Sequence, residues 1–342
     1  MKKMDKKNKT KKNKTKKKSN LKLIDKILIP VFSLIIVASL VSVGATVLLN
    51  THFLKDDNSK TDDGIIDRNI KTPEIEKEKS VNFLVAGVDY IAGTGRGKLT
   101  DVVMVVNFDI KSKNINILQI PRDTYIGDDY PTGKINAIYG RKENGGIEGL
   151  ARRINKTFNI PIDHYVTITL DGFQSVIKKI GGVMVDIPKK IVLDNVTLHK
   201  GKQLLNAETA MKFVRERHSY ANQDLGRMEM QKLFMKSLIE KMFEMPKSKI
   251  VSLAPNILKD VTTDLNIKTV LEYYEDIIKV DKNNNINFHM LPTIGGARNG
   301  KVSVLSIKKE ETAKLLNEKF RPHSNPVESE DLGVIELITN YK

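Results

Sequence analysis

The sequence has neither cysteine nor tryptophan among its 342 residues. The absence of cysteine excludes disulfide bonds, cysteine-ligated zinc and thiol nucleophiles. It does not identify the compartment, because many exported bacterial proteins also lack cysteine and are stabilised by their core alone. With 40% hydrophobic residues, the chain can bury the core of one large domain or of two smaller ones.

The positive charge is concentrated near the N-terminus. The formal net charge is +16, and residues 1–26 contribute +11 of it through 13 lysines and 2 aspartates. The rest of the chain carries only +5, so the basic composition says little about the ligand of a folded domain. Residues 1–20 are almost free of apolar side chains, which predicts a disordered basic tail. We expect no nucleic-acid partner.

An uncharged segment of 23 residues, Ile27–Leu49, is long enough to cross a bilayer as one helix. A buried core helix would carry a polar stripe. A cleaved signal peptide would have a shorter apolar region and a small-residue cleavage site, which Leu48-Leu49-Asn50 does not provide. The preceding lysines place the N-terminus in the cytoplasm. We therefore predict a single-pass signal anchor in the cell membrane, a polar extracellular linker at residues 50–79, and an extracellular domain that begins at residue 80.

Short apolar runs alternate with helical patterns after residue 80. This alternation indicates an α/β or mixed α+β sandwich with a central sheet. Two segments, Asp194–Leu205 and Asn283–Asn285, predict surface loops. The predicted strands are Val81–Val88, Val102–Phe108, Ile115–Ile120, Tyr165–Leu170, Val183–Ile187 and Ile286–Leu291. The predicted helices are Glu148–Phe158, Phe173–Ile180 and Met228–Phe243.

Two aspartates lie at the ends of neighbouring predicted strands. Asp89 follows the first strand and Asp101 precedes the second, 12 residues later, across a glycine-rich loop. If these strands are antiparallel, both carboxylates reach one end of the sheet, where they suit Mg²⁺ completed by phosphate oxygens and water. The structural alternative is that each caps a turn. The loop is not a Walker A motif, because Ala92 and Leu99 stand where glycine and Ser or Thr are required.

Arginines follow other predicted elements. Arg122 comes after the third strand, and Arg215 and Arg217 are two residues apart, a spacing that on a strand directs both to one face. Arg227 and Gln231 are four residues apart and share one face of the next helix. Each arginine alone is typical of a solvated surface. Because guanidinium groups bind phosphate oxygens in pairs, several of them together with two aspartates indicate an anion site.

Many short motifs occur in an order that resembles the catalytic domain of LytR-CpsA-Psr proteins. The resemblance covers residues 80–243, about half of the chain, and extends to residue 320, which leaves residues 321–342 as a C-terminal extension. The short cytoplasmic tail and single span also fit this family's layout. The motifs are Phe83–Asp89, Thr100-Asp101, Ile120–Thr124, Gly133–Ala137, Ile160–Tyr165, Asp171–Phe173, Gly181–Val183, Leu205–Glu208, Val214–His218, Gly226-Arg227 and Gln231.

The resemblance implies an α-β-α sandwich that holds a polyprenyl diphosphate, with its acyl chain in an apolar tunnel. It assigns Asp89 and Asp101 as ligands of Mg²⁺, for which Mn²⁺ can substitute. It assigns the groups that clamp the pyrophosphate, or lie near it, to Arg122, Arg215, Arg217, Arg227, Gln231, Lys134 and Asn136.

Two positions depart from the family pattern. Many members carry arginine two residues before the second metal aspartate, where this chain has Leu99. Arg96 or Lys98, on the same loop, could supply that charge. A second arginine common in the last motif is Met230 here. The general base stays open between Asp224, three residues before Arg227, and one of the metal-site aspartates; a helix-capping role is the alternative for Asp224.

The activity implied is phosphoryl transfer. A peptidoglycan sugar hydroxyl attacks the pyrophosphate of an undecaprenyl-diphosphate-linked glycopolymer, such as a teichoic acid or a capsular polysaccharide, and undecaprenyl phosphate leaves. Catalysis of this type depends mainly on positioning and charge neutralisation. A non-catalytic sensor or attenuator of lipid-linked intermediates is the alternative from another class, and pyrophosphate hydrolysis is a variant. A DNA-binding regulator would rest on the lysine tail alone.

Overall fold

A computed structural model of the chain describes residues 80–90, 98–130, 132–194, 196–216, 223–265, 273, 276–298, 302–335 and 337. The predicted tail, anchor and linker, residues 1–79, lie outside this set. None of the helices within the described residues combines the length and the apolar character needed to cross a bilayer.

Six strands form a central mixed sheet in the order β10-β3-β2-β1-β4-β9. The pairs β1–β2, β2–β3 and β4–β9 are antiparallel, whereas β1–β4 and β3–β10 are parallel. This arrangement confirms the predicted central mixed sheet. The strands are β1 (Ser80–Asp89), β2 (Leu99–Asp109), β3 (Asn114–Ile120), β4 (His164–Thr169), β9 (Val261–Thr263) and β10 (Ile286–Met290).

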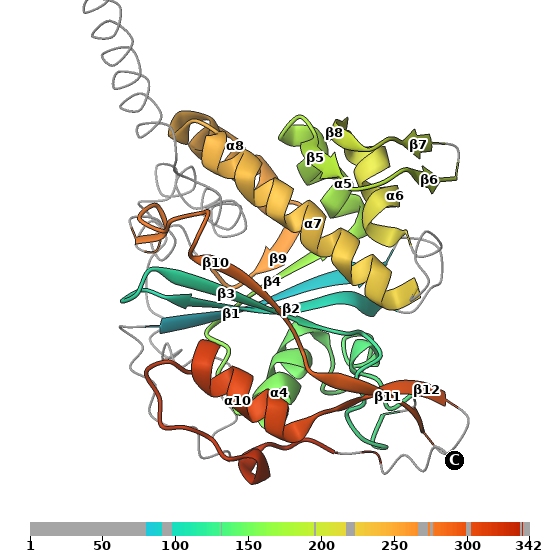
Figure 1. Ribbon diagram of the computed structural model, residues 1–342, viewed down its shortest axis with the longest axis vertical. Coiled ribbons are helices and arrows are strands. Elements are labelled where there is room, and N and C mark those ends of the chain that lie inside the picture. The colour runs from blue at the N-terminus through green and yellow to red at the C-terminus, as the bar shows by residue number, and fades with distance from the viewer. Residues whose placement is uncertain are drawn as a thin grey trace, which may run out of the picture.

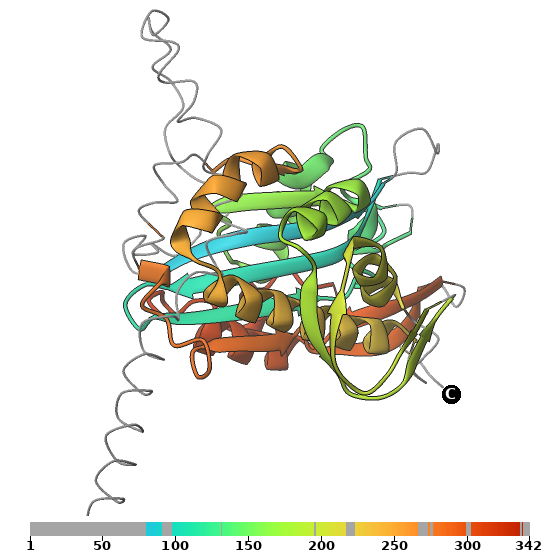
Figure 2. The same ribbon diagram turned by 90° about the horizontal axis from the view of Figure 1, so that it is seen from above.

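Helices cover both faces of the sheet, so the domain has three layers (Figure 1). On one face lie α5 (Leu170–Lys179), α6 (Ala207–Arg215), α7 (Gln223–Glu244) and α8 (Lys247–Leu258). On the other face lie α4 (Gly146–Phe158) and α10 (Lys309–Lys319), together with the hairpin of β11 (Thr293–Arg298) and β12 (Val302–Ile307). Seen from above, the strands of the sheet lie side by side, with α7 and α8 passing across them (Figure 2).

The two apolar cores follow from the alternation of side chains along the strands. In β1, Val81 and Phe83 contribute to the core under α5, α7 and α8, whereas Leu84 and Ala86 contribute to the core around α4 and α10. Successive side chains of a strand point to opposite faces, and both faces of this sheet are covered. This explains why the run from Val81 to Val88 is apolar almost throughout rather than alternating with polar residues.

The prediction of a surface loop at Asp194–Leu205 was wrong. Two short strands occupy most of it: β7 (Val196–Leu198) pairs with β6 (Ile191–Leu193), and β8 (Gly201–Leu205) pairs with β5 (Val183–Ile187). In β8 only Leu205 is buried, and Leu204 is exposed. The strand has one solvated face and is short, so its sequence reads as polar. Pairing with β5, rather than local apolar pattern, makes it a strand.

The chain after α10 packs back onto the α4 side of the domain. Val327 and Leu332 belong to the core that includes α4, and Arg321 is 3% exposed. Two short 3₁₀ helices complete the described elements: η1 (Ile135–Ala137), which lies against β2, and η2 (Ser329–Asp331), which lies against α10.

Candidate functional site

The predicted metal aspartates lie at one end of the β1–β2 hairpin. Asp89 ends β1, and the pairing shifts between Gly87 and Val88, which leaves Asp101 as the extra residue of a β-bulge in β2. A bulge interrupts the alternation of side chains and redirects one of them. As a result, Asp101 lines the same cavity as Asp89 and Val102. The antiparallel pairing and the shared sheet end predicted for the two carboxylates are confirmed.

Glycine at position 87 permits the close approach of the strands at this bulge. A Cβ atom added there would lie 3.0 Å from the Cβ of Val102, a distance at which Val102 would have to move. Sequence reasoning missed this requirement. The only available signal was a glycine inside an apolar strand, which often marks a bulge or a close backbone contact.

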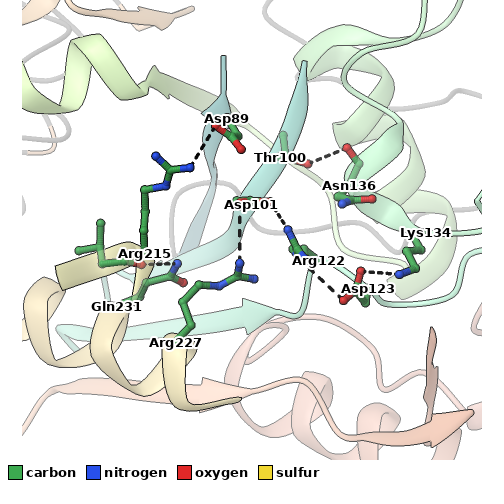
Figure 3. Close-up of polar contacts among 11 residues, drawn as sticks. Asp89, Thr100, Asp101, Arg122, Asp123, Lys134, Asn136, Arg215, Arg227 and Gln231 are labelled. Carbon is green, nitrogen blue, oxygen red and sulfur yellow. Dashed lines mark hydrogen bonds and ion pairs between the residues drawn. The ribbon is translucent and has the colours of Figure 1, made fainter. Parts of the chain in front are cut away.

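Asp101 is held by two arginines from different elements (Figure 3). Arg122, just after β3, places Nη1 2.9 Å from Oδ1 of Asp101, and Arg227, near the start of α7, places Nη1 3.7 Å from Oδ2. Arg227 is 3% exposed, whereas the Asp101 side chain is 20% exposed. A buried guanidinium that faces a partly solvated carboxylate is positioned to contact an anion arriving from the solvent side.

Arg215 approaches the other aspartate. Its Nη2 lies 3.9 Å from Oδ1 of Asp89, and its side chain is 45% exposed. The strand geometry considered for Arg215 and Arg217 does not apply to Arg215, because it is the last residue of α6. Asn206 caps that helix by accepting a hydrogen bond from the backbone N–H of Thr209, a helix-start signal that a reading based on the spacing of two arginines overlooks.

Lys134 and Asn136 support Arg122 from the side. Lys134 Nζ lies 2.9 Å from Oδ1 of Asp123, and Arg122 Nε lies 3.8 Å from the second oxygen of the same carboxylate. The backbone N–H of Asn136 donates to the carbonyl of Arg122, and the hydroxyl of Thr100 donates to the Asn136 carbonyl. The Gly133–Ala137 motif therefore connects the loop that carries Arg122 with the strand that carries Asp101.

Gln231 connects the two helices that carry the other arginines. It lies one turn after Arg227 on α7 and is 7% exposed. Its side-chain amide donates a hydrogen bond of 3.2 Å to the carbonyl of Val214, the residue before Arg215 on α6. Gln231 also lines the cavity, so this contact positions α6 and α7 relative to each other at the site.

The remaining predicted residues have different outcomes. Arg217 lies outside the described residues, and so does the side chain of Asp224, whose backbone belongs to the first turn of α7. Met230, which replaces a family arginine, is buried in the core beneath the α7 side of the sheet. Leu99 is 40% exposed at the start of β2. Five of the residues singled out from the sequence therefore lie together around one end of the sheet: Asp89, Asp101, Arg122, Arg215 and Arg227.

A mostly apolar cavity of about 190 Å³ opens from this group of charges. Its lining runs along α7 from Arg227 to Met242, 15 residues apart, or about 22 Å at the rise of an α-helix. The charged residues lie at one end, and the rest of the lining is apolar apart from Thr169 and Gln231. That lining includes Val85 of β1, Met104 of β2, Phe173 of α5, Phe234 of α7, Ile257 of α8 and Val261 of β9.

Sequence reasoning from the residues missed the walls of this cavity. Phe173, Phe234 and Met242 lie in ordinary apolar helix patterns, which are equally typical of a filled core. No sequence signal distinguishes an apolar side chain at a void from one in close contact. Two guanidinium groups and two carboxylates line one end of this apolar cavity, and a third guanidinium group, that of Arg122, is paired with Asp101. This arrangement can hold an amphiphile with an anionic head and a long apolar tail.

Asp89 and Asp101 offer a metal ion two carboxylates at one end of the cavity. Among the described residues, no group of three His, Cys, Asp or Glu side chains gathers as a metal site would require. Two carboxylates at a partly exposed mouth fit Mg²⁺, because this ion usually binds proteins through one or two carboxylates and keeps water and substrate phosphates as its other ligands. The pair does not fit a metal that needs a complete protein cage.

The chain is similar to a family of known proteins. The profile of the LytR_cpsA_psr family matches residues 46–321. The polyisoprenyl-teichoic acid–peptidoglycan teichoic acid transferase TagV of Bacillus subtilis (strain 168) is 34% identical over 205 residues, which cover 56% of this chain and 51% of that protein. The corresponding transferase TagU of Bacillus mycoides (strain KBAB4) is 29% identical over 174 residues, which cover 50% and 56%.

A solved structure supports the same relationship. The crystal structure of B. subtilis TagV matches with a TM-score of 0.60 and 28% identity, over 70% of this chain and 96% of that one. The chain spans about half the length of the curated relatives named above.

Proposed function

The chain belongs to the LytR-CpsA-Psr family, and from that premise we propose that it is a Mg²⁺-dependent phosphotransferase of the cell surface. It moves an anionic glycopolymer, a teichoic acid or a capsular-type polysaccharide, from an undecaprenyl-diphosphate carrier to peptidoglycan. The observation that carries this proposal is the position of Asp89, Asp101, Arg215 and Arg227 in the lining of the apolar cavity, with Arg122 paired to Asp101. The names of the TagV and TagU relatives, both teichoic acid transferases, agree with it.

The cavity and the charges suit the two parts of such a carrier. The apolar lining along α7 accepts the prenyl chain, because apolar surface gains free energy by leaving water. The arginines accept the diphosphate, whose oxygens they can bind in pairs. Arg227, which is buried, gives the strongest field, since its charge is little screened by water. Arg215, which is exposed, can follow the head group as it enters.

The reaction proposed is displacement at phosphorus. The hydroxyl oxygen of a peptidoglycan sugar forms a bond to the phosphorus next to the glycopolymer. The bond from that phosphorus to the bridging oxygen breaks, and undecaprenyl phosphate leaves with the electron pair. Arg122 and Arg227 stabilise the charge that develops on the leaving phosphate. A bound Mg²⁺ at Asp89 and Asp101 would supply charge neutralisation of the phosphate oxygens.

The proton of the attacking hydroxyl needs an acceptor. Asp224, at the start of α7, and the two metal-site aspartates are the candidates. We further propose that residues 27–49 anchor the enzyme in the cell membrane with its N-terminus in the cytoplasm. This places residues 80–342 on the outer side, where lipid-linked polymers and peptidoglycan meet.

The test is a transfer assay with the full chain in detergent micelles, a lipid-diphosphate oligosaccharide, peptidoglycan oligomers and Mg²⁺. We expect a covalent polymer–peptidoglycan product, and a rate about a hundredfold lower for Arg122→Ala and Asp101→Ala, the usual effect of losing one charge-stabilising contact. Arg152→Ala, on the exposed side of α4, is the matched control and should leave the rate unchanged.

Other results of this assay would point to other functions or residue roles. Equal product from the two site variants would refute the proposed role of these residues. Release of the polymer without attachment to peptidoglycan would identify a hydrolase. Binding of the lipid carrier that survives replacement of both aspartates, without any product, would support the sensor alternative.

A further inference from the structure

A second group of cations lies beside the site of Asp89 and Asp101. Lys98 Nζ lies over the ring of Tyr90, 5.0 Å from its centre. The Cζ atoms of Arg141 and Arg153 both lie over the ring of Tyr130, at 4.8 and 5.4 Å. These five side chains are called the cation–tyrosine strip below.

The strip begins at the proposed active site. Lys98 directly precedes β2, the strand that carries Asp101. Gly140, next to Arg141, packs so closely on Lys98 that an added Cβ atom would lie 2.4 Å from the Lys98 carbonyl oxygen. The backbones that carry Lys98 and Arg141 are therefore in contact, and the cations lead away from the site toward α4.

The Tyr130 end of the strip is connected to the site by a short loop. Tyr125 and Lys134 form a β-bridge, and the N–H of Ile126 donates to the carbonyl of Gly133, so Tyr130 lies in the loop that these pairs close. The Arg141 side chain donates a hydrogen bond of 3.2 Å to the carbonyl of Asp129 in that loop. One arm of this loop carries Lys134, which belongs to the group around Arg122.

Arg153 is a buried cation at the Tyr130 end of the strip. It is 8% exposed, and among the described residues its Nε and Nη2 atoms have no hydrogen-bond partner. Burial lowers the pKa of its guanidinium, against the opposing effect of Tyr130 and Asp129. A desolvated cation without acceptors opposes folding. The negative charge of a nearby ligand would offset the cost of burying this cation.

We propose that the cation–tyrosine strip binds an anionic glycan that extends from the active site, with sugar rings against the tyrosines and acidic groups against the cations. Flat aromatic rings offer apolar surface for the faces of sugars, and guanidinium groups bind phosphates or carboxylates in pairs. This rests on the proposed function and adds the path of the sugar chain. Two substrates share this chemistry: the glycopolymer of the donor and the peptidoglycan of the acceptor.

The experiment measures binding of two soluble probes to the full chain by titration calorimetry. One probe is a sugar-phosphate oligomer without lipid, and the other is a peptidoglycan tetrasaccharide with its peptides. Arg141→Gln and Arg153→Gln are each expected to raise the Kd of one probe about tenfold, because a hydrogen bond to a charged group is worth about that factor or more. Lys142→Gln and Arg152→Gln, each adjacent in sequence to one of the arginines, are the matched controls and should leave both Kd values unchanged.

The pattern of loss identifies the glycan. Weaker binding of the sugar-phosphate oligomer assigns the strip to the donor, and weaker binding of the tetrasaccharide assigns it to the acceptor. Unchanged Kd values for both probes in both arginine variants would overturn the proposal. Because these probes carry no lipid diphosphate, the result does not depend on transfer. If the transfer assay fails but the probes still bind and the arginine variants weaken that binding, the proposed function is refuted and the glycan-binding role of the strip is still supported.

Folding of the Arg153 variant is checked by its thermal midpoint. We expect Arg153→Gln to be as stable as the parent or more so, since it removes a desolvated cation, while its Kd rises. A purely structural role for Arg153 predicts the opposite sign, a lower midpoint. If this variant fails to fold, the Kd values of Arg141→Gln still test the proposal. Arg141 is exposed, so its replacement should not disturb folding.

Discussion

The two proposed metal aspartates should differ strongly in their effect on stability. Asp101 faces Arg227, which is buried, and Arg122, whereas Asp89 faces Arg215, whose side chain is 45% exposed. Asp101→Asn therefore leaves a buried guanidinium without its carboxylate, and Asp89→Asn leaves only a solvated one. We expect the first variant to be clearly less stable and the second to be close to the parent.

The magnitude follows from the distances and the exposure. Two unit charges 3.7 Å apart, as for Arg227 and Asp101, attract with about 4.5 kcal/mol at an effective dielectric constant of about 20. Solvent around the 20%-exposed Asp101 reduces the net value, so the loss should be near the lower end of that for a broken buried pair, about 3 kcal/mol. For Asp89 at 3.9 Å from exposed Arg215, about 0.5 kcal/mol is expected.

The assay is urea and thermal unfolding of the full chain with EDTA, so that divalent cations do not contribute. For a domain of this size, about 3 kcal/mol lowers the thermal midpoint by at least about 6 °C, and about 0.5 kcal/mol by less than about 2 °C. The urea slope should stay the same, because the exposed surface on unfolding does not change.

A double-mutant cycle separates the pair from other effects. In an Arg227→Gln background, Asp101→Asn should cost only about 1 kcal/mol, since the buried charge is already gone. Equal losses for Asp101→Asn and Asp89→Asn, or an unchanged cost in the Arg227→Gln background, would refute this reasoning.

Three further outcomes are expected. Gly333→Ala should lower the free energy of unfolding by about 2 kcal/mol or more in urea titrations, because the new Cβ atom would lie 2.2 Å from the carbonyl oxygen of Lys156 and force the C-terminal segment away from α4. His289 is hydrogen-bonded to Asn116, and burial, followed by nearby lysines, lowers the pKa of its imidazole. Its contribution to stability is therefore present above the unfolded pKa of about 6.5 and is lost as the pH falls from there through the lowered folded pKa. His289→Gln should make the free energy of unfolding depend less on pH over that range. Val85→Trp should fill part of the apolar cavity, and we expect it to raise the KM for a long-prenyl donor while sparing a short-prenyl one in the transfer assay.

The strands around the site could be predicted because both of their faces are buried. The apolar runs at Val81–Val88 and Val102–Phe108 needed no tertiary information to be identified, and a connection by one short loop favours antiparallel pairing. The end of the sheet where Asp89 and Asp101 meet follows from that pairing. The arginines were recognised as an anion site from their type and spacing, and the motif resemblance added their assignment to a pyrophosphate.

Other features could not be read from sequence because they depend on distant partners. Arg215 belongs to a helix that is held in place through Val214 and Gln231. β8 is a strand because β5 pairs with it, not because of its own apolar pattern. Short segments have weak local preference, so tertiary contacts decide their conformation.

The sequence by itself determined the class of fold and the charged residues that gather at one end of the sheet, because residue type and local periodicity are properties of the chain alone. Only the tertiary structure decided that the bulge turns Asp101 toward the cavity, that the walls along α7 leave a void, and that Arg153 is buried over Tyr130. These features arise where segments far apart in the chain meet, and their energies depend on distances and on excluded water that no linear pattern encodes.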